Sequence, residues 1–315
     1  MIVIVTGASG YIGGEISLKL HDAGHVIVGI DLRPCPEHLK FCFNHFVQED
    51  FANPEVLEFI GKAGADAIIH CAGTSLVGPS ITNPELYYSN NIVKTKSLLD
   101  TIVEQTSSTR LIFSSSAAVY GTPFITPCDE VDPCDPISPY GESKLMIEWM
   151  MRSYRQAYKL DYVAFRYFNA AGADSQGRHG QEPGATHIVA RVLESIRNDS
   201  DFFLYGNNYE TVDGTCVRDY VHVEDIADAH ILALNNHIPS GVYNIGTSTG
   251  TTNSQIIEVA EDITEKSVHV TIETQRKGDP ATLTASSALF QKTANWKPKY
   301  NIEDIIKHAW IWYNK

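Results

Sequence analysis

The sequence predicts a doubly wound α/β fold, in which a parallel sheet covered by helices is followed by a smaller mixed α/β cap. Three observations carry this prediction. Short apolar runs alternate with helical segments through residues 1–170, a glycine-rich turn follows the first run, and loops rich in Gly, Asn and Asp become frequent beyond residue 170. The apolar runs are β-branched and nearly continuous, which is typical of parallel strands buried on both faces.

Expected strands and expected helices follow one another in the order of a doubly wound sheet. The strands are expected at "IVIVT", "HVIVGID", "DAIIHCAG", "RLIFSSS" and "YVAFRYF". Helices are expected over residues 11–23, 55–62, 90–104 and 140–158, and in the second half over residues 223–235 and 301–313.

The composition excludes several classes of protein. The 315 residues carry a formal net charge of -14, which argues against a nucleic-acid partner, because such binding needs clustered Lys and Arg. The opening "MIVIVTGASG" has neither the basic region of a signal peptide nor the length of a membrane span, so no membrane partner is expected. The six cysteines show no CxxC spacing, which favours a cytoplasmic protein without a disulfide framework or a metal site.

The first chemical motif is "TGASGYIG", whose three glycines follow a strand and open a helix: Gly7, Gly10 and Gly13. Such spacing lets backbone N–H groups approach a pyrophosphate at the positive end of the helix. The next strand ends in Asp31, whose carboxylate can accept both hydroxyls of an adenosine ribose and repels a 2′-phosphate. We therefore expect NAD rather than NADP, although Arg33 can offset the repulsion. Asp50 is expected either to reach the adenine or to be a solvated loop carboxylate.

A tyrosine and a lysine one helical turn apart form the second motif. In "SPYGESK", Tyr140 and Lys144 lie on one face of the expected helix, so both can meet the same ligand. An adjacent ammonium and a cationic nicotinamide favour the phenolate, which free tyrosine, with a pKa near ~10, rarely forms at neutral pH. Tyr140 is therefore expected to be a general base toward an alcohol. Ser116, at the end of "LIFSSS", is expected to hydrogen-bond the reacting oxygen.

Several longer segments occur in order along nearly the whole chain: "TGASGYIG", "HCAGTSLVGPS", "YYSNNI", "FSSSAAVYG", "SPYGESKLMIE", "RYFNAAGAD", "YGNNYETVDGTCVRDYVHVEDIADAH" and "RKGDPATLTASS". Together they resemble the UDP-glucose (UDP-galactose) 4-epimerase family, within the extended short-chain dehydrogenase/reductase (NAD-dependent epimerase/dehydratase) superfamily. The resemblance implies a Rossmann-like NAD-binding domain over residues 1–170, to which residues from about 214–247 return, and a mainly UDP-sugar-binding domain over residues 171–315.

The resemblance also implies a reaction. Family members keep NAD bound, and Tyr140 would take the proton of the sugar 4-hydroxyl while hydride leaves C4. The resulting 4-keto sugar turns over before hydride returns to its opposite face, so the configuration at C4 inverts. Ser116 would steady the oxygen at C4, and Lys144 would bind the nicotinamide ribose and lower the pKa of Tyr140. The implied catalytic residues are Ser116, Tyr140 and Lys144.

The binding residues implied by the resemblance fall into two groups. The cofactor group comprises Gly7, Gly10, Tyr11, Ile12, Gly13, Asp31, Asp50, Phe51, Cys71, Ala72, Gly73, Asn91, Ser114, Tyr140, Lys144 and Tyr167. The substrate group comprises Ser116, Ala117, Asn169, His187, Tyr205, Arg218, Tyr220, Arg276 and Asp279. Within it, Asn169 and the two arginines would grip the diphosphate, Asp279 would reach the uridine ribose, and Tyr205 would stack near uracil.

Three positions bear on the strength and the selectivity of binding. Ser75 stands where many such epimerases carry a lysine that reaches the cofactor, so NAD is expected to be held less tightly. His187 occupies a sugar-nucleotide position that is asparagine in some relatives. Leu283 stands at the position that governs the sugar range, and its bulk favours UDP-glucose and UDP-galactose over the N-acetylated pair.

Other functions stay open at this point. A 4-epimerase of another UDP-sugar, such as UDP-N-acetylglucosamine, UDP-xylose/arabinose or UDP-glucuronate, would share the mechanism. A non-epimerising dehydrogenase of the same fold would release NADH, and a non-catalytic NAD sensor would not need Tyr140 and Lys144. A 4,6-dehydratase would need an Asp-Glu pair where this chain reads Ser116-Ala117-Ala118. Apolar faces in "IVKTKSLLDTIV" and "LMIEWMMRSY" resemble the helical contact of a homodimer.

Overall fold

The computed structural model describes residues 1–105, 108–235, 237–276 and 279–315. The chain divides into two compact units. The first comprises Met1–Gly121, Pro133–Arg166 and Ala227–Tyr243, and the second comprises Thr122–Asp132, Tyr167–Ile226 and Asn244–Lys315. The segment Ala227–Tyr243, which returns to the first unit, lies within the range 214–247 expected for it. Residues 277–278, within "RKGDPATLTASS", lie outside the described residues.

A seven-stranded sheet forms the centre of the first unit, which confirms the predicted doubly wound fold. The strand order is β10-β6-β5-β4-β1-β2-β3, and β1 runs parallel to both β2 and β4. The strands are β1 (Ile2–Thr6), β2 (Val26–Asp31), β3 (His45–Gln48), β4 (Ala67–His70), β5 (Arg110–Ser116), β6 (Tyr162–Tyr167) and β10 (Gly241–Ile245). The order reverses between β1 and β4, and sheets of this kind bind ligands at such a reversal, beyond the carboxyl ends of the strands.

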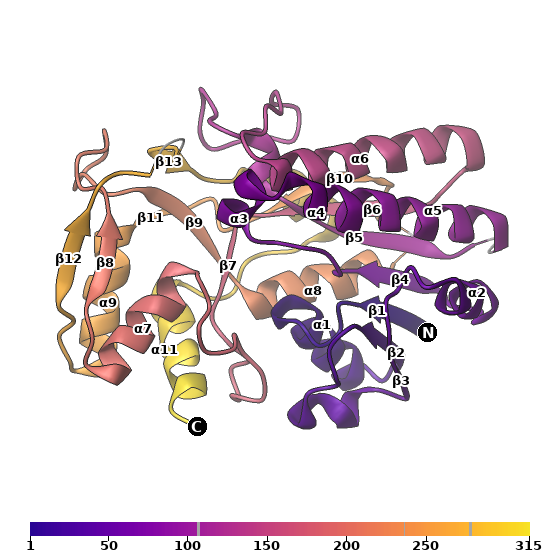
Figure 1. Ribbon diagram of the computed structural model, residues 1–315, viewed down its shortest axis with the longest axis horizontal. Coiled ribbons are helices and arrows are strands. Elements are labelled where there is room, and N and C mark those ends of the chain that lie inside the picture. The colour runs from indigo at the N-terminus through magenta and orange to yellow at the C-terminus, as the bar shows by residue number, and fades with distance from the viewer. Residues whose placement is uncertain (106–107, 236, 277–278) are drawn as a thin grey trace. The chain divides into compact units, whose positions relative to one another are not determined.

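Helices cover both faces of this sheet. Figure 1 shows α5 and α6 on one face and α1 on the other. The helices of this part of the chain are α1 (Tyr11–Asp22), η1 (Glu37–Cys42), α2 (Pro54–Lys62), α3 (Val77–Thr82), α4 (Pro84–Tyr87), η2 (Tyr88–Val93), α5 (Lys94–Gln105), η3 (Ala117–Tyr120), α6 (Pro139–Tyr158) and α8 (Val223–Ala233). The helix expected over residues 90–104 is in fact two elements, because the π-helical η2 precedes α5.

The core of the first unit lies between the sheet and its helices. Ile4, Ile68 and Leu111 from three adjacent strands are fully buried, and they belong to the same apolar cluster as Leu98 of α5 and Ile147 of α6. Burying such a side chain contributes about 1.5–3 kcal/mol. The strands and helices that carry the candidate site are therefore held rigidly by one continuous core.

The helix that carries the Tyr-x-x-x-Lys motif begins at a well-defined cap. The Ser138 hydroxyl accepts a hydrogen bond from the backbone N–H of Gly141 at 3.2 Å, and Pro139 occupies the first helical position, where its missing N–H costs nothing. The helix ends at Lys159, whose backbone is left-handed with φ of 66°. This start places Tyr140 in the first turn of α6.

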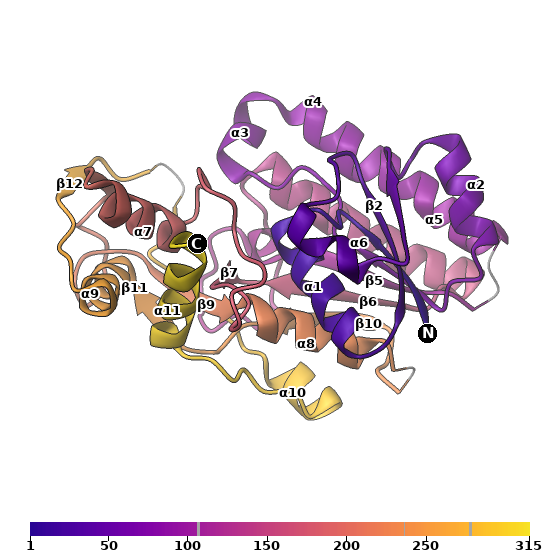
Figure 2. The same ribbon diagram turned by 90° about the horizontal axis from the view of Figure 1, so that it is seen from below.

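The second unit contains two smaller sheets and a group of helices. In one sheet β9 pairs with β11, β13 and β7, and in the other β12 pairs with β8. Figure 2 shows α7, α9 and α11 gathered together, where Val192, Ile256 and Ile306 are fully buried in one cluster. The elements are β7 (Asn169–Ala171), α7 (Ile188–Asn198), β8 (Phe202–Tyr205), β9 (Val217–His222), β11 (Gly250–Thr252), α9 (Asn253–Thr264), β12 (Val270–Glu273), β13 (Thr282–Leu283), α10 (Ala288–Ala294) and α11 (Ile302–Tyr313).

No helix within the described ranges is both long enough and apolar enough to cross a membrane.

Candidate active site

The glycine-rich loop of the first unit brings the backbone close to its neighbours. Gly7 has φ of +72°, and a Cβ atom there would lie 2.7 Å from the backbone nitrogen of Ala72. A Cβ atom on Gly13 would lie 2.2 Å from the carbonyl oxygen of Gly7. Gly10 caps α1 without a side-chain hydrogen bond, so no capping side chain covers the start of the helix, where backbone N–H groups can bind an anion.

Asp31 lies at the carboxyl end of β2, beside this loop. Its carboxylate accepts hydrogen bonds from the backbone N–H groups of Ser9 at 3.0 Å and of Arg33 at 2.9 Å. The Arg33 guanidinium also approaches it, with Nε 3.4 Å from Oδ1. Asp31 is therefore held in place, and Arg33 lies where it can offset the carboxylate charge.

Asp50 forms an ion pair that the sequence did not predict. Its Oδ2 atom lies 2.7 Å from Lys94 Nζ of α5, and its Oδ1 atom accepts the backbone N–H of Ala52 at 3.0 Å. The neighbouring Phe51 is buried and packs edge-on against His70, with ring centres 4.8 Å apart. Asp50 thus joins its loop to α5 as a partly buried ion pair.

A buried histidine, which the sequence did not predict, lies where the strand order reverses between β1 and β4. His70 ends β4, and its two ring nitrogens share hydrogen bonds with Thr6 at 2.7 Å and with Thr95 at 2.9 Å. Burial lowers the pKa of His70 to about 3, and the charge of Lys144 acts in the same direction. The imidazole is therefore neutral and links β1, β4 and α5 just below the loop that contains Cys71, Ala72 and Gly73.

Asn91 supports that loop from η2. Its side-chain oxygen accepts the backbone N–H of Thr74 at 2.8 Å, and its amide nitrogen donates to the Thr74 carbonyl at 3.0 Å and to the Ser143 hydroxyl at 2.9 Å. Both amide hydrogens are therefore used within the protein. Gly73, with φ of +152°, leaves no room for a Cβ atom, which would lie 2.9 Å from Asn91 Oδ1.

The three serines at the end of β5 have three different partners. Ser114 donates to the Cys71 sulfur at 3.2 Å, and Ser115 donates to Glu148 on the other side of the strand at 2.5 Å. Ser116 accepts the backbone N–H of Ala118 at 3.2 Å and hydrogen-bonds the Tyr140 phenol. Of the three, Ser116 is the one that contacts Tyr140. Ala117, which follows it, is buried at the start of η3.

Tyr140 and Lys144 lie on the same face of α6. Lys144 Nζ donates to the Ser114 carbonyl at 2.9 Å and lies 5.8 Å from the centre of the Tyr140 ring. Burial lowers the pKa of Lys144 to about 8. Burial also raises the pKa of Tyr140, while the hydrogen bond from Ser116 lowers it. This direction is opposite to the one expected for a phenol beside an ammonium, because burial outweighs the hydrogen bond from Ser116.

A buried ion pair, also missed by the sequence reading, fixes α6 against β5 and β6. Arg166 donates to Glu148 from Nη2 at 2.8 Å and from Nε at 3.1 Å, and from Nη1 to the Tyr120 hydroxyl at 2.9 Å. Because Glu148 also accepts from Ser115, the network connects the serine run to the helix one turn beyond Lys144. Both charged side chains are nearly inaccessible.

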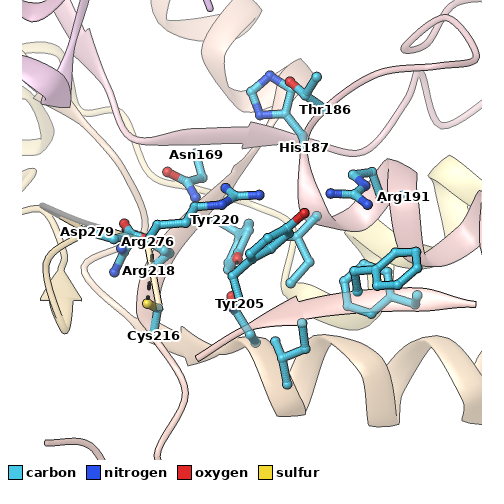
Figure 3. A pocket seen from close by; sticks show the side chains of 15 residues that line it. Asn169, Thr186, His187, Arg191, Tyr205, Cys216, Arg218, Tyr220, Arg276 and Asp279 are labelled. Atoms are coloured by element: carbon cyan, nitrogen blue, oxygen red, sulfur yellow. Dashed lines mark hydrogen bonds and ion pairs between the residues drawn. The ribbon is translucent and has the colours of Figure 1, made fainter. Parts of the chain in front are cut away.

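The second unit contains a pocket of about 210 Å³. Seven of the predicted substrate residues line it: Asn169, His187, Tyr205, Arg218, Tyr220, Arg276 and Asp279. Figure 3 shows how they surround one space. Asn169 and Tyr220 face each other in the register between β7 and β9. The fold therefore brings these seven residues to one pocket within this unit.

Arg218 forms an ion pair with Asp279 in this pocket. Its Nη2 atom donates to Asp279 Oδ1 at 2.5 Å, and its Nη1 atom donates to the Val217 carbonyl at 2.7 Å. The next residue, Asp219, is fully buried and accepts hydrogen bonds from the backbone of Thr247 at 2.7 Å and of Ala285 at 3.1 Å. Asp219 was not singled out in the sequence, yet it anchors the strand that presents Arg218.

An aromatic ring and an exposed arginine form another part of the pocket wall. The Arg276 guanidinium carbon lies 4.0 Å from the centre of the Tyr205 ring. Thr186 and His187 contribute from the start of α7, and Arg191 contributes from one turn further along. Arg191 carried no expectation from the sequence, because an arginine in an amphipathic helix usually lies on the solvated face.

Three predicted residues lie elsewhere. Leu283 is absent from the described lining of this pocket and lies on β13, opposite Arg218 in the register with β9. Tyr167 is buried at the end of β6. Ser75 is exposed just after the Gly73 turn.

The first unit fits a dinucleotide. The loop at Gly7 and Gly13 has no room for side chains, the first turn of α1 offers backbone donors, and Asp31 presents a fixed carboxylate at the end of the next strand. A doubly wound sheet with these features, together with a Tyr-x-x-x-Lys helix, defines a class of dinucleotide-dependent enzymes. The chain belongs to the NAD dependent epimerase/dehydratase family, whose model matches residues 3–246.

Particular relatives in this family are similar over the full length. A UDP-glucose 4-epimerase of Halalkalibacterium halodurans is 38% identical, with 100% of this chain and 96% of the relative covered. A crystal structure of UDP-glucose 4-epimerase from Bifidobacterium longum, in complex with NAD+ and UDP, is 30% identical with a TM-score of 0.92, covering 100% and 98% of the two chains. A UDP-glucose-4-epimerase from Stenotrophomonas maltophila, with bound NAD and formylated UDP-arabinopyranose, is 30% identical with a TM-score of 0.94, covering 100% and 98%.

Proposed function

We propose that this protein interconverts UDP-galactose and UDP-glucose by inverting C4 of the hexose with bound NAD. The observation that supports this most directly is the group formed by Ser116, Tyr140 and Lys144 in a chain of this family. The Ser116 hydroxyl meets the Tyr140 phenol, and Lys144 Nζ lies beside the same ring. A hydrogen-bonded hydroxyl, a phenol and a cation together can bind an alcohol oxygen and move its proton.

NAD, when bound, supplies a reversible hydride acceptor. Tyr140 accepts the proton of the 4-hydroxyl as the sugar is oxidised and returns it as the 4-keto sugar is reduced on its other face. Ser116 hydrogen-bonds the same oxygen in both directions. Lys144, held by the Ser114 carbonyl, would donate to the nicotinamide ribose and would contribute positive charge near the phenol while it is protonated. Net redox change is therefore zero, and no second substrate is needed.

The remaining residues of the first unit bind the cofactor. The Gly7–Gly13 loop and the first turn of α1 hold the pyrophosphate, and Asp31 accepts the hydroxyls of the adenosine ribose, which favours NAD over NADP. Cys71, Ala72 and Gly73 lie beyond β4, where they border the cofactor, and Phe51 packs beneath them. Asn91 acts through the Gly73–Thr74 turn rather than as a direct ligand, because its amide hydrogens are already donated within the protein.

The pocket of the second unit holds the UDP portion. Arg218, Arg276 and Asn169 provide donors for the diphosphate, as guanidinium groups do for phosphates elsewhere. The first N–H groups of α7 are additional donors, because its cap residue, His187, makes no side-chain cap hydrogen bond. Tyr205 offers a ring for the uracil, and Asp279 offers a carboxylate for the uridine ribose.

The proposed reaction is tested by incubating the purified protein with UDP-galactose and following C4 by NMR. UDP-glucose should form until equilibrium is reached, without accumulation of reduced cofactor. UDP-N-acetylglucosamine, UDP-xylose and UDP-glucuronate, offered separately, measure the sugar range. Stoichiometric release of NADH would identify a dehydrogenase, and the absence of inversion with every sugar would refute the proposal.

We also propose a homodimer formed through α5 and α6 of the first unit. Met146 and Trp149 on α6 are 39% and 49% exposed, and a pair of apolar side chains on a helix surface suits a symmetric contact between copies. Sedimentation of the wild type should give a dimer, and Trp149→Glu should give a folded monomer.

We also propose that the protein is cytoplasmic. No disulfide joins any of the six cysteines, all of which lie within the described residues, and this suits a reducing compartment. Fractionation of the source cells would test this location.

A further inference from the structure

We propose that Arg191 reads the nucleobase of the bound nucleotide sugar. Its guanidinium donates hydrogen bonds to the O4 carbonyl of uracil, so the pocket selects uridine nucleotides over cytidine nucleotides. This inference rests on the proposed function, because it concerns the same UDP-binding pocket, and it assigns the base selectivity to a side chain outside the diphosphate-binding group.

Arg191 points into the pocket because of its place on α7. Its backbone N–H donates to the His187 carbonyl at 3.0 Å, so the two residues lie one helical turn apart on one face of the helix. Both line the pocket. Arg191 is only partly exposed, and within the described part of the chain its guanidinium has no carboxylate partner. Its guanidinium carbon lies 5.8 Å from the centre of the Phe202 ring.

The other two arginines of the pocket are already engaged. Arg218 forms an ion pair with Asp279 at 2.5 Å, and Arg276 stacks on Tyr205 at 4.0 Å. In the view of Figure 3, Arg191 lies on the opposite side of Tyr205 from Arg276 and Asp279. Arg276 and Asp279 therefore lie on one side of the Tyr205 ring, and Arg191 lies on the other.

The aromatic side of the pocket suits a planar base. Phe203 and Tyr205, which alternate along β8 with the buried Phe202 and Leu204, line the same pocket as Arg191, and aromatic side chains of this kind pack against nucleobases. A guanidinium only donates hydrogen bonds. Uracil presents an acceptor at O4, whereas cytosine presents an amino group at the same position. Arg191 therefore stabilises uracil and opposes the amino hydrogens of cytosine.

The experiment compares UDP and CDP binding to the wild type, Arg191→Met and Arg191→Gln by isothermal titration calorimetry. The wild type should bind UDP more tightly than CDP. Arg191→Met removes the donors while keeping the length of the side chain, and UDP affinity should fall by about tenfold or more while CDP affinity changes little. Arg191→Gln can donate to O4 or accept from the cytosine amino group, so it should bind the two nucleotides with similar affinities.

The matched control is Arg152→Met, which removes the same charge from an exposed position on α6. It should leave both affinities unchanged. An equal loss of UDP and CDP affinity in Arg191→Met would mean that Arg191 binds phosphate, and it would overturn the inference. An unchanged ratio of affinities in both Arg191 variants would overturn it as well. If the wild type inverts UDP-galactose but does not discriminate between UDP and CDP, the inference fails while the proposed function stands.

Discussion

Lys144 Nζ lies 5.8 Å from the centre of the Tyr140 ring, one turn along the same face of α6. This arrangement does not by itself create a phenolate, because burial raises the pKa of Tyr140 and lowers that of Lys144 to about 8. The ligand-free protein therefore holds Tyr140 as a neutral phenol. An additional positive charge from bound oxidised NAD favours the phenolate, which couples proton transfer to the presence of the cofactor.

The buried His70 makes the first unit sensitive to acid. Its pKa is about 3 in the folded protein against the ordinary 6.5, so between these values the unfolded chain binds a proton that the folded chain does not. The free energy of unfolding should therefore fall, as pH drops below about 6, by up to about 1.4 kcal/mol per pH unit from this group. Urea unfolding of the wild type and His70→Gln at a series of pH values checks this. Parallel pH dependences for the two proteins would contradict it.

Gly13 should not tolerate a side chain. In Gly13→Ala the new methyl group would lie 2.2 Å from the Gly7 carbonyl oxygen, and backbone atoms cannot move aside easily. We expect a loss of about 1–3 kcal/mol of stability together with weaker NAD binding, measured by urea unfolding and by the cofactor content of the purified protein. Gly78→Ala is the matched control, because nothing lies within 4 Å of a Cβ atom there. Full NAD content in Gly13→Ala would contradict the proposed site.

The Glu148–Arg166 pair should be essential to stability. Glu148→Gln leaves a buried guanidinium without its counter-charge, which costs about 3–5 kcal/mol. Glu58→Gln, which breaks the exposed pair with Lys62, should change stability little. Urea unfolding of both variants makes the comparison. If the two variants lost the same free energy of unfolding, the buried Glu148–Arg166 pair would matter no more than the exposed pair, which would contradict the prediction.

Arg33 should weaken the discrimination between NAD and NADP. Its Nη2 atom lies 3.3 Å from a Cβ position on Gly10, and its Nε atom lies 3.4 Å from Asp31, so it can meet a 2′-phosphate that Asp31 repels. Arg33→Ala should raise the ratio of NAD to NADP affinity by about tenfold, measured by titration of cofactor-free protein. Arg152→Ala, which removes an arginine from an exposed position on α6, is the control and should leave this ratio unchanged. An unchanged ratio would place Arg33 outside the cofactor site.

The sheet could be predicted because its strands are nearly pure apolar runs. β1, β2 and β4 pack between helices, and burial on both faces leaves a clear signal in the sequence. The three shortest strands of the second unit gave no such signal. β7, β11 and β13 have two or three residues each and contain Asn, Gly and Thr, so their pairing depends on tertiary contacts that a local pattern does not reveal.

The parts of the candidate site that could be predicted are those whose residues lie close together in the sequence. Gly7, Gly10 and Gly13 lie in one loop, and Tyr140 and Lys144 lie in one turn. Charged groups whose partners are distant in sequence were not predictable, because Glu148 and Arg166 resemble surface residues until the fold brings them together. The same reason applies to Asp50, whose partner Lys94 lies on α5.

The central claim is that Tyr140 transfers the proton of the sugar 4-hydroxyl. It is tested most directly by measuring kcat for UDP-galactose with Tyr140→Phe, alongside the NAD content and UDP affinity of the same preparation. The account predicts that kcat falls by about 10²–10⁴-fold while NAD content and UDP affinity stay close to those of the wild type. A variant that epimerises UDP-galactose at nearly the wild-type rate would contradict the claim.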